Sequence, residues 1–123
     1  MEKRLFETKF EALIACRNHW QFMWITGSHN KYDYGPANEW YSSCACCEYD
    51  KGMLNFSIRS KKSYCEFCPL RGYAWERYCS YNKKSFYGHW YAAETLEQRQ
   101  FYAGRMVYAC NQAIENYLLN KEN

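Results

Sequence analysis

The sequence of 123 residues lacks the features that would place a protein in or across a membrane. No apolar run approaches the roughly 20 residues that a membrane-spanning helix needs. The N-terminal stretch MEKRLFETKFEALIAC is interrupted by Glu7, Lys9 and Glu11, so it has no apolar segment of the kind found in signal peptides. The mean hydropathy is −0.72 despite many aromatic residues. These absences predict a soluble protein of a reducing cytoplasm.

The sequence also lacks the common catalytic motifs. It contains no H-E-x-x-H, no phosphate-binding Walker loop and no G-x-S-x-G. The zinc deaminase signature needs H-x-E and P-C-x-x-C. No H-x-E is present, and Pro69 follows a cysteine pair instead of preceding one. A nucleophilic pair of Cys79 and His89 stays open from the sequence, but as a whole the chain is predicted not to be an enzyme.

The sequence is rich in aromatic residues and cysteines. Aromatics make up 20% of the chain, with 13 Tyr, 7 Phe and 5 Trp, and such side chains serve both cores and interfaces. There are eight cysteines, which in a cytoplasmic protein favour metal binding or core thiols over disulfides. The length fits one domain, and neither a repeat nor a linker divides it. We therefore expect a single zinc-stabilised domain over residues 1–123.

Two helices are predicted to flank a cysteine-rich centre. Residues 4–25 show apolar side chains close to the 3.6-residue period, and Gly27 stands where such a helix would end. Residues 27–43 are predicted to be an irregular loop. The chain is predicted to be helical again over about 86–119. Thr95 and Gln98 resemble a capping box that would start the long helix of this part.

The predicted fold is mainly α, with the two long helices packed together and a loop-rich centre, residues 44–80, folded over one end. Residues 53–58 alternate weakly and leave a small α+β fold open. The apolar stripe expected on the last helix comprises Ala103, Met106, Val107, Cys110, Ala113, Ile114, Tyr117 and Leu118. Cys16 and Cys110 lie on or beside helix stripes, so their predicted role is core packing.

The strongest motif is a pair of cysteine pairs. Cys44 and Cys47 are separated by two residues, as are Cys65 and Cys68, and 17 residues lie between the pairs. This spacing is typical of a tetrahedral four-cysteine zinc site, in which two tight turns point four sulfurs at one ion. A four-thiolate site leaves no position for water, so the one zinc ion expected per chain is structural.

Alternative ligands and an alternative metal remain open. Cys46 could replace Cys47, although the spacing from Cys44 to Cys46 suits a metal site less well. Cys79, which follows Cys68 after ten residues, could substitute for another ligand, and so could His89, although His89 has no support from spacing. An iron–sulfur cluster competes with zinc because the sequence CEFCP also suits such a cluster, but the spacing between the pairs differs from that of ferredoxins. Zinc on the four paired cysteines is the primary prediction.

At these motifs the chain resembles a group of small cysteine-rich zinc-binding proteins encoded by bacteriophages. The similarity lies in CACCEY, CEFCPL, a further cysteine, GHWYAAE and, near the N-terminus, RNHWQFMW. In that group, mostly of unassigned function, the paired cysteines correspond to Cys44, Cys47, Cys65 and Cys68, and Cys79 stands where a fifth cysteine recurs. The additional Cys46 departs from the pattern. The resemblance implies a phage accessory protein in the cytoplasm of an infected bacterial host.

Two functions follow as hypotheses. The first is a binding protein that inhibits or modulates a host bacterial protein, with a defence system as one candidate target, through exposed aromatic side chains. The aromatic residues considered as contacts are Trp40, Tyr41, Tyr73, Trp75, Tyr78, Tyr81, Tyr87, Trp90 and Tyr91. Because a small domain needs a core, more than half of these are expected to be buried.

The second hypothesis is a nucleic-acid-binding zinc protein. Residues 59–64 and 81–87 interleave basic and aromatic side chains, which suits phosphate contacts and base stacking. The residues considered as contacts in these segments are Arg59, Lys61, Lys62, Tyr81, Lys83 and Lys84. Residues 56–91 carry seven Lys or Arg against two Glu, which gives this segment +5, whereas the whole chain has a net charge of +3. A zinc ion with four thiolates adds −2, so the metal-bound chain would be only weakly basic.

Overall fold

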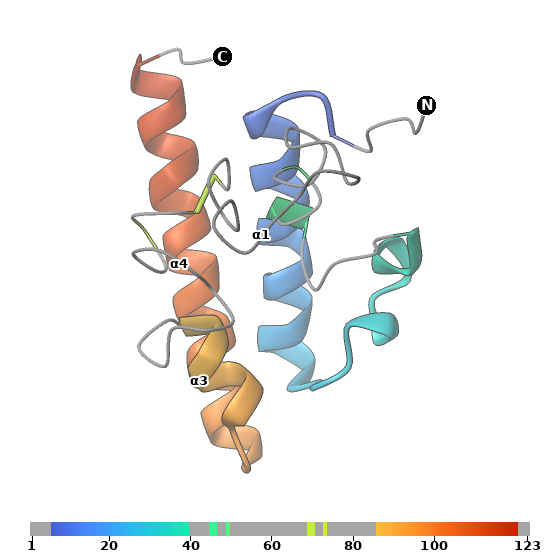
Figure 1. Ribbon diagram of the computed structural model, residues 1–123. Coiled ribbons are helices and arrows are strands. Elements are labelled where there is room, and N and C mark those ends of the chain that lie inside the picture. Colours follow the sequence, from blue (N-terminus) through green and yellow to red (C-terminus); the bar gives the residue numbers. More distant parts are fainter. Residues whose placement is uncertain are drawn as a thin grey trace, which may run out of the picture.

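The computed structural model describes residues 6–39, 45–46, 49, 69–70, 73 and 86–120. Its elements are α1 (Lys9–Thr26), two short 3-10 helices η1 (Lys31–Asp33) and η2 (Gly35–Glu39), α3 (Phe86–Ala92) and α4 (Leu96–Asn120). No β-strand occurs in these ranges, and residues 53–58 lie outside them. α1 and α4 lie side by side and run in opposite directions, with α3 against the first half of α4 (Figure 1). The predicted mainly α fold with two packed long helices is confirmed.

A capping box determines where α1 begins. The Thr8 hydroxyl accepts a hydrogen bond from the Glu11 N–H at 3.1 Å, and the Glu11 carboxylate accepts one from the Thr8 N–H at 3.1 Å. Both groups satisfy backbone donors that have no partner inside the helix. The predicted start at residue 4 is therefore too early, because Phe6–Thr8 are not helical. The T-x-x-E signal was present in the sequence.

The end of α1 is completed by side chains from α4. Gly27 adopts a left-handed conformation with φ of 72° and donates its N–H to the Met23 carbonyl at 2.8 Å. Arg99 Nε donates to the Gly27 carbonyl at 2.8 Å, and Gln100 Nε2 donates to the Trp24 carbonyl at 3.1 Å. The last turn of α1 has no basic residue of its own. Arg99 therefore supplies the positive charge that stabilises a helix C-terminus.

The start of α4 agrees with the prediction. The Gln98 N–H donates to Thr95 Oγ1 at 3.1 Å, and Gln98 Oε1 accepts from the Thr95 N–H at 3.3 Å and the Glu94 N–H at 3.0 Å. This reciprocal cap keeps α3 and α4 as separate helices, because the Glu94 and Thr95 N–H groups donate to the Gln98 side chain and not to the carbonyl groups of α3.

The core forms between α1, α3 and α4 and includes a few residues of the central segment. Its buried members include Leu13, Cys16, Trp20, Met23, Ala45, Cys46, Leu70, Tyr87, Trp90, Ala103, Met106, Val107, Ala109, Cys110, Ala113 and Ile114. The predicted burial of Cys16 and Cys110 is confirmed. At the far end, the rings of Phe10 and Tyr117 stack with centroids 5.6 Å apart.

Leu118 does not belong to the buried stripe, although the sequence placed it there. It is 54% exposed. It lies about 100° further round the helix than Tyr117, beyond the edge of the contact with α1. Trp24 of α1 is also exposed, by 45%, and its ring lies against Gly104. None of the described helices is long and apolar enough to cross a membrane.

Candidate functional site: an aromatic pocket

The four primary predicted metal ligands and seven of the predicted partner or nucleic-acid contacts lie outside the described residues. They are Cys44, Cys47, Cys65 and Cys68 for the metal, and Arg59, Lys61, Lys62, Trp75, Tyr81, Lys83 and Lys84 for a partner or nucleic acid. In the part of the chain that is described, no group of three or more His, Cys, Asp or Glu side chains could hold a metal ion. The zinc site therefore stays a prediction.

Sequence neighbours of both cysteine pairs lie in the core. Ala45 and Cys46, which stand between the first two predicted ligands, are fully buried. Leu70, two residues after the second pair, is also fully buried and belongs to the same hydrophobic cluster. The Cys46 sulfur lies 3.9 Å from the Ala12 carbonyl oxygen of α1.

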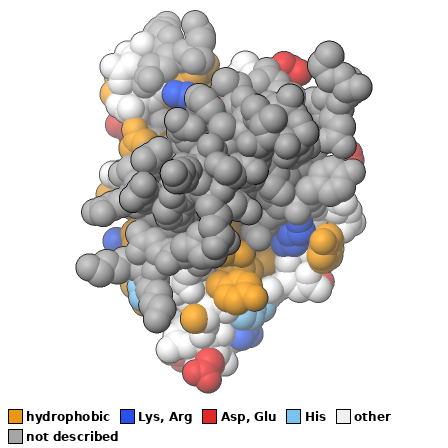
Figure 2. Space-filling view, viewed as in Figure 1, with side chains coloured by type: hydrophobic (Ala, Val, Ile, Leu, Met, Phe, Trp, Pro, Cys, Tyr) orange, Lys and Arg blue, Asp and Glu red, His pale blue; other side chains and the backbone are white. Residues whose placement is uncertain are grey.

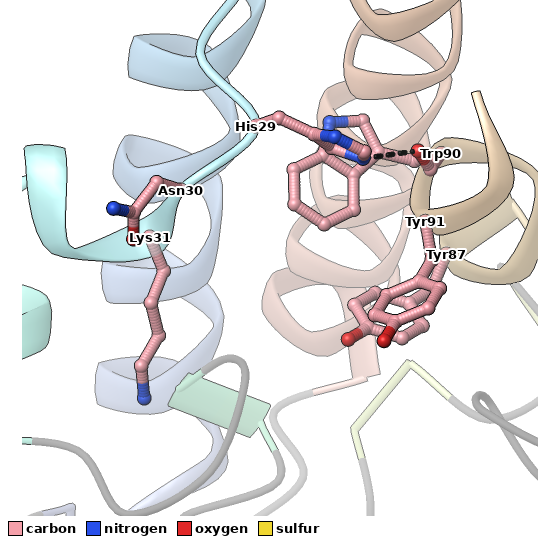
Figure 3. Close-up of a pocket in the computed structure, with 6 residues that line it drawn as sticks. All are labelled: His29, Asn30, Lys31, Tyr87, Trp90 and Tyr91. Atoms are coloured by element: carbon pink, nitrogen blue, oxygen red, sulfur yellow. Dashed lines mark hydrogen bonds between the residues drawn. The ribbon is translucent and has the colours of Figure 1, made fainter. Parts of the chain in front are cut away.

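A cavity of about 530 Å³ lies between the loop that follows α1 and the helix α3. Its described lining residues are His29, Asn30, Lys31, Tyr87, Trp90 and Tyr91. Asn30 and Lys31 line one side and the aromatic residues of α3 line the other, with His29 against Trp90 (Figure 3). On the surface, hydrophobic side chains gather beside a histidine where α3 approaches the end of α1 (Figure 2). The volume lies within the range of small ligand sites.

Local hydrogen bonds shape the loop side of the pocket. The Ser28 hydroxyl binds the Asp33 carboxylate and accepts from the Asn30 N–H at 3.1 Å. The Asn30 side-chain oxygen accepts from the Tyr32 N–H at 3.0 Å and so caps η1. Asn and Ser readily make such local side-chain bonds, which is why they favour turns. The loop thus turns back toward α3 immediately after the end of α1.

His29 joins this loop to α3. Its Nε2 lies 3.0 Å from the Trp90 carbonyl oxygen, and its ring meets the Trp90 ring edge-on with centroids 4.7 Å apart. A carbonyl oxygen cannot donate, so Nε2 must carry a proton and donate this hydrogen bond. When the ring is neutral, Nδ1 is therefore its acceptor nitrogen.

The aromatic side of the pocket rests on the core. The Trp20 ring of α1 meets the Trp90 ring edge-on with centroids 4.9 Å apart and the Tyr87 ring at 6.1 Å. Tyr91 follows Tyr87 by one helical turn, and their ring centroids are 6.1 Å apart. Tyr87 and Trp90 are buried, whereas Tyr91 is 68% exposed. Rigid buried rings therefore hold one exposed tyrosine at the mouth of the pocket.

The chemistry of the pocket is aromatic and basic. The described lining residues offer π faces from the two tyrosines and Trp90, and the ammonium group of Lys31. The Lys31 Nζ also lies 5.0 Å from the centre of the Tyr32 ring. Such a site suits an apolar or aromatic group that packs against the exposed rings.

His19 is the one buried histidine among the described residues, and it belongs to the core rather than to the pocket. Its ring lies 4.9 Å from the Trp20 ring and 5.5 Å from the Tyr34 ring. Burial, together with the nearby positive charge of Lys31, lowers the pKa of His19 to about 4. Burial also raises the pKa of Tyr34. His19 is therefore uncharged at neutral pH, as expected of a histidine packed in the core.

Four of the predicted aromatic contacts lie in the described residues, and they differ in how far they are buried. Tyr87 and Trp90 are buried, Tyr73 is partly buried and Tyr91 is exposed. The sequence did not indicate His29 or Lys31 as pocket residues. His29 is 61 positions away from its partner Trp90, and no local pattern reveals such a contact.

Comparison with protein families, curated proteins and solved structures finds no match for this chain.

Proposed function

We propose that this chain is a phage-encoded binding protein that acts in the cytoplasm of an infected bacterium. It binds and inhibits or modulates a host protein, is not an enzyme, and carries a structural zinc ion held by Cys44, Cys47, Cys65 and Cys68. The phage origin and the host setting rest on the resemblance of the cysteine and tryptophan motifs. The observation that carries the binding role is the aromatic pocket between α3 and the loop after α1.

The pocket supports protein binding because it combines rigidity with an exposed anchor. Buried Trp20 and Trp90 both contact the Tyr87 ring, and Tyr87 in turn contacts the exposed Tyr91 ring. This support reduces the side-chain entropy that Tyr91 loses when a partner packs against it. Tyrosine and tryptophan dominate the binding energy of many interfaces. Lys31 adds an ammonium group to the lining of the pocket. The proposed partner segment therefore presents an aromatic or aliphatic side chain to the aromatic residues of the pocket.

The burial of residues beside both cysteine pairs supports the zinc proposal. Cys46 precedes Cys47 in the sequence, and Leu70 follows Cys68 by two residues. Cys46 and Leu70 belong to one hydrophobic cluster that also contains residues of α1 and α4. A zinc ion shared by the two pairs would fasten the central segment to this core, and its binding energy would add to the free energy of folding.

Nucleic-acid binding is less well supported by the described residues. Of the basic segment 81–87, the structure describes Phe86 and Tyr87. Tyr87 is buried against Trp20, so its ring is not free to stack on a base. Phe86 lies under the guanidinium group of Arg105, 5.2 Å from the ring centre. Neither ring offers the exposed platform that single-strand binding uses.

The test is affinity capture from a bacterial lysate, followed by binding of the identified partner in purified form. The baits are the wild type, Tyr91→Ala and Leu118→Ala. Leu118 provides the control because it is an exposed apolar side chain on a different helix, α4. We expect Tyr91→Ala to weaken binding of the purified partner at least about tenfold, as for an interface anchor, and Leu118→Ala to leave it nearly unchanged.

Two results would contradict the proposal. Equal binding of the partner by the wild type and Tyr91→Ala would exclude the pocket as its binding site. Capture that disappears after nuclease treatment, and that falls steeply with added salt, would favour nucleic-acid binding instead.

A further inference from the structure

The outer face of α4 carries a second exposed surface that the proposed function does not use. Six exposed positions follow each other at spacings of four and three residues, which places them on one stripe of the helix. They are Phe101, Arg105, Tyr108, Gln112, Glu115 and Leu119. Phe101, Tyr108 and Leu119 are 60%, 54% and 76% exposed. The stripe is opposite the buried face that contacts α1, so α1 does not cover it.

The six positions are arranged symmetrically about Cys110. Positions 101 and 119, 105 and 115, and 108 and 112 are equally distant from it. Two α4 helices that cross at this point in antiparallel orientation would therefore place Phe101 of one copy against Leu119 of the other. Arg105 would face Glu115, and Tyr108 would face Gln112.

The chemistry of each facing pair is complementary. The outer pair is apolar, the next pair joins a guanidinium group to a carboxylate, and the central pair can share hydrogen bonds. Within one chain Gln112 already donates to the Tyr108 hydroxyl at 2.9 Å, so the two side chains can form such a bond. The stripe has no net charge, because Arg105 and Glu115 cancel. A partner with strong charge of either sign would leave one of them facing a like charge.

We infer that the chain forms a homodimer through this stripe, with two α4 helices packed antiparallel. The occupant is a second copy because the stripe complements itself in charge and in apolar contacts. From Phe101 to Leu119 the helix rises about 27 Å, which is long enough for about five turns of contact. A single helix face per copy is a small interface, so a Kd on the order of 10 μM is expected.

Charge reversal tests the pairing directly. Sedimentation equilibrium of the full chain under reducing conditions, over about 1–200 μM, is expected to show a monomer–dimer equilibrium. Arg105→Glu and Glu115→Arg should each weaken the dimer at least about tenfold, because like charges then face each other twice. The double variant R105E/E115R should restore it, since each reversed charge meets a reversed partner. Glu94→Lys, a charge reversal outside α4, is the matched control and should leave the dimer unchanged.

The antiparallel orientation of the two α4 helices can be tested separately by cross-linking. In the Arg105→Lys variant, a zero-length carbodiimide cross-linker can join the introduced amine to a carboxylate, and mass spectrometry identifies the linked peptides. Positions 105 and 115 of one helix are about 15 Å apart, too far for such a link, so a 105–115 cross-link must join two copies.

Restoration of the dimer in the double variant, together with the 105–115 cross-link, supports the pairing. A wild-type chain that stays monomeric over the whole range overturns it, and so does a dimer that neither single reversal weakens. A double variant that is as weak as the single ones also counts against this pairing. None of these results bears on the pocket, because Tyr91 lies on α3 and not on the stripe.

Discussion

Replacement of Gly27 by alanine is expected to destabilise the chain by about 2 kcal/mol. Gly27 has a φ of 72°, and alanine in this left-handed conformation costs about 1–2 kcal/mol relative to glycine. The added Cβ would also overlap Cδ1 of Leu96. Because Leu96 is half exposed and the clash involves the end of its side chain, a rotation relieves it at a cost of about 0.5–1 kcal/mol.

The assay is urea unfolding followed by far-ultraviolet circular dichroism, with thermal unfolding as a second measure. For a chain of this length, a loss of about 2 kcal/mol should lower Tm by about 8 °C. Gly35→Ala is the matched control, since no atom lies within 4 Å of its added Cβ and Gly35 has no positive φ. It should change the free energy of unfolding by less than about 1 kcal/mol, toward greater stability.

A second variant separates the two contributions. Adding Leu96→Ala removes the overlap, so Gly27→Ala should cost less in the Leu96→Ala background than in the wild type, but still about 1 kcal/mol because the backbone strain remains. If Gly27→Ala unfolds at the same urea concentration as the wild type and Gly35→Ala, the reasoning from the helix end is wrong.

Three further predictions concern charge and metal. The folded state keeps His19 neutral with its pKa near 4, against 6.5 when exposed, so the unfolded state takes up the proton first as the pH falls. The free energy of unfolding should therefore decrease as the pH falls from 6.5 to 4, with at most about 3 kcal/mol of the loss due to His19. In a plot of the urea midpoint against pH, His19→Gln should flatten this decrease. An unchanged plot would show that His19 does not cause it. Arg99→Met should lower the free energy of unfolding by about 1–2 kcal/mol, because the Gly27 carbonyl loses a charged donor at the end of α1; Arg99→Lys, which retains the charge, should lose less. Elemental analysis should find about one zinc per chain, lost in Cys44→Ser and Cys68→Ser together with much stability and retained in Cys46→Ala; metal-free protein after reducing purification would rule the site out.

The long helices were predictable because their signals are local. The apolar period of residues 9–26, the glycine at position 27 and the Thr95–Gln98 box all act within one or two turns of the chain. A start of α1 at residue 4 is wrong, although Thr8 and Glu11 also form a local signal. The apolar residues Leu5 and Phe6 fit the helical period and so extend the apparent stripe past the cap.

The pocket was not predictable in the same way. Tyr87, Trp90 and Tyr91 are aromatic neighbours on α3, and nothing in the local sequence shows which of them is buried. The burial of Tyr87 and Trp90 depends on where Trp20 of α1 contacts α3. The same holds for Leu118, whose exposure depends on how far around α4 the contact with α1 extends. The burial of these side chains depends on contacts with residues distant in the sequence, and the periodicity of one helix does not show where those contacts end.

The sequence by itself thus determined two long helices, their caps at Gly27 and Thr95, and the burial of Cys16 and Cys110. It also predicts the zinc ligands, since a C-x₂-C spacing indicates a metal site before the fold of the chain is known. Tertiary structure decided that Arg99 completes the end of α1, that His29 reaches Trp90, and that Tyr91 faces solvent while Tyr87 and Trp90 beside it on α3 are buried. The physical reason is the distance in sequence over which the interactions act. A helix cap or a C-x₂-C pair involves residues a few positions apart, whereas the exposure of a side chain depends on the packing of helices that are distant in the sequence.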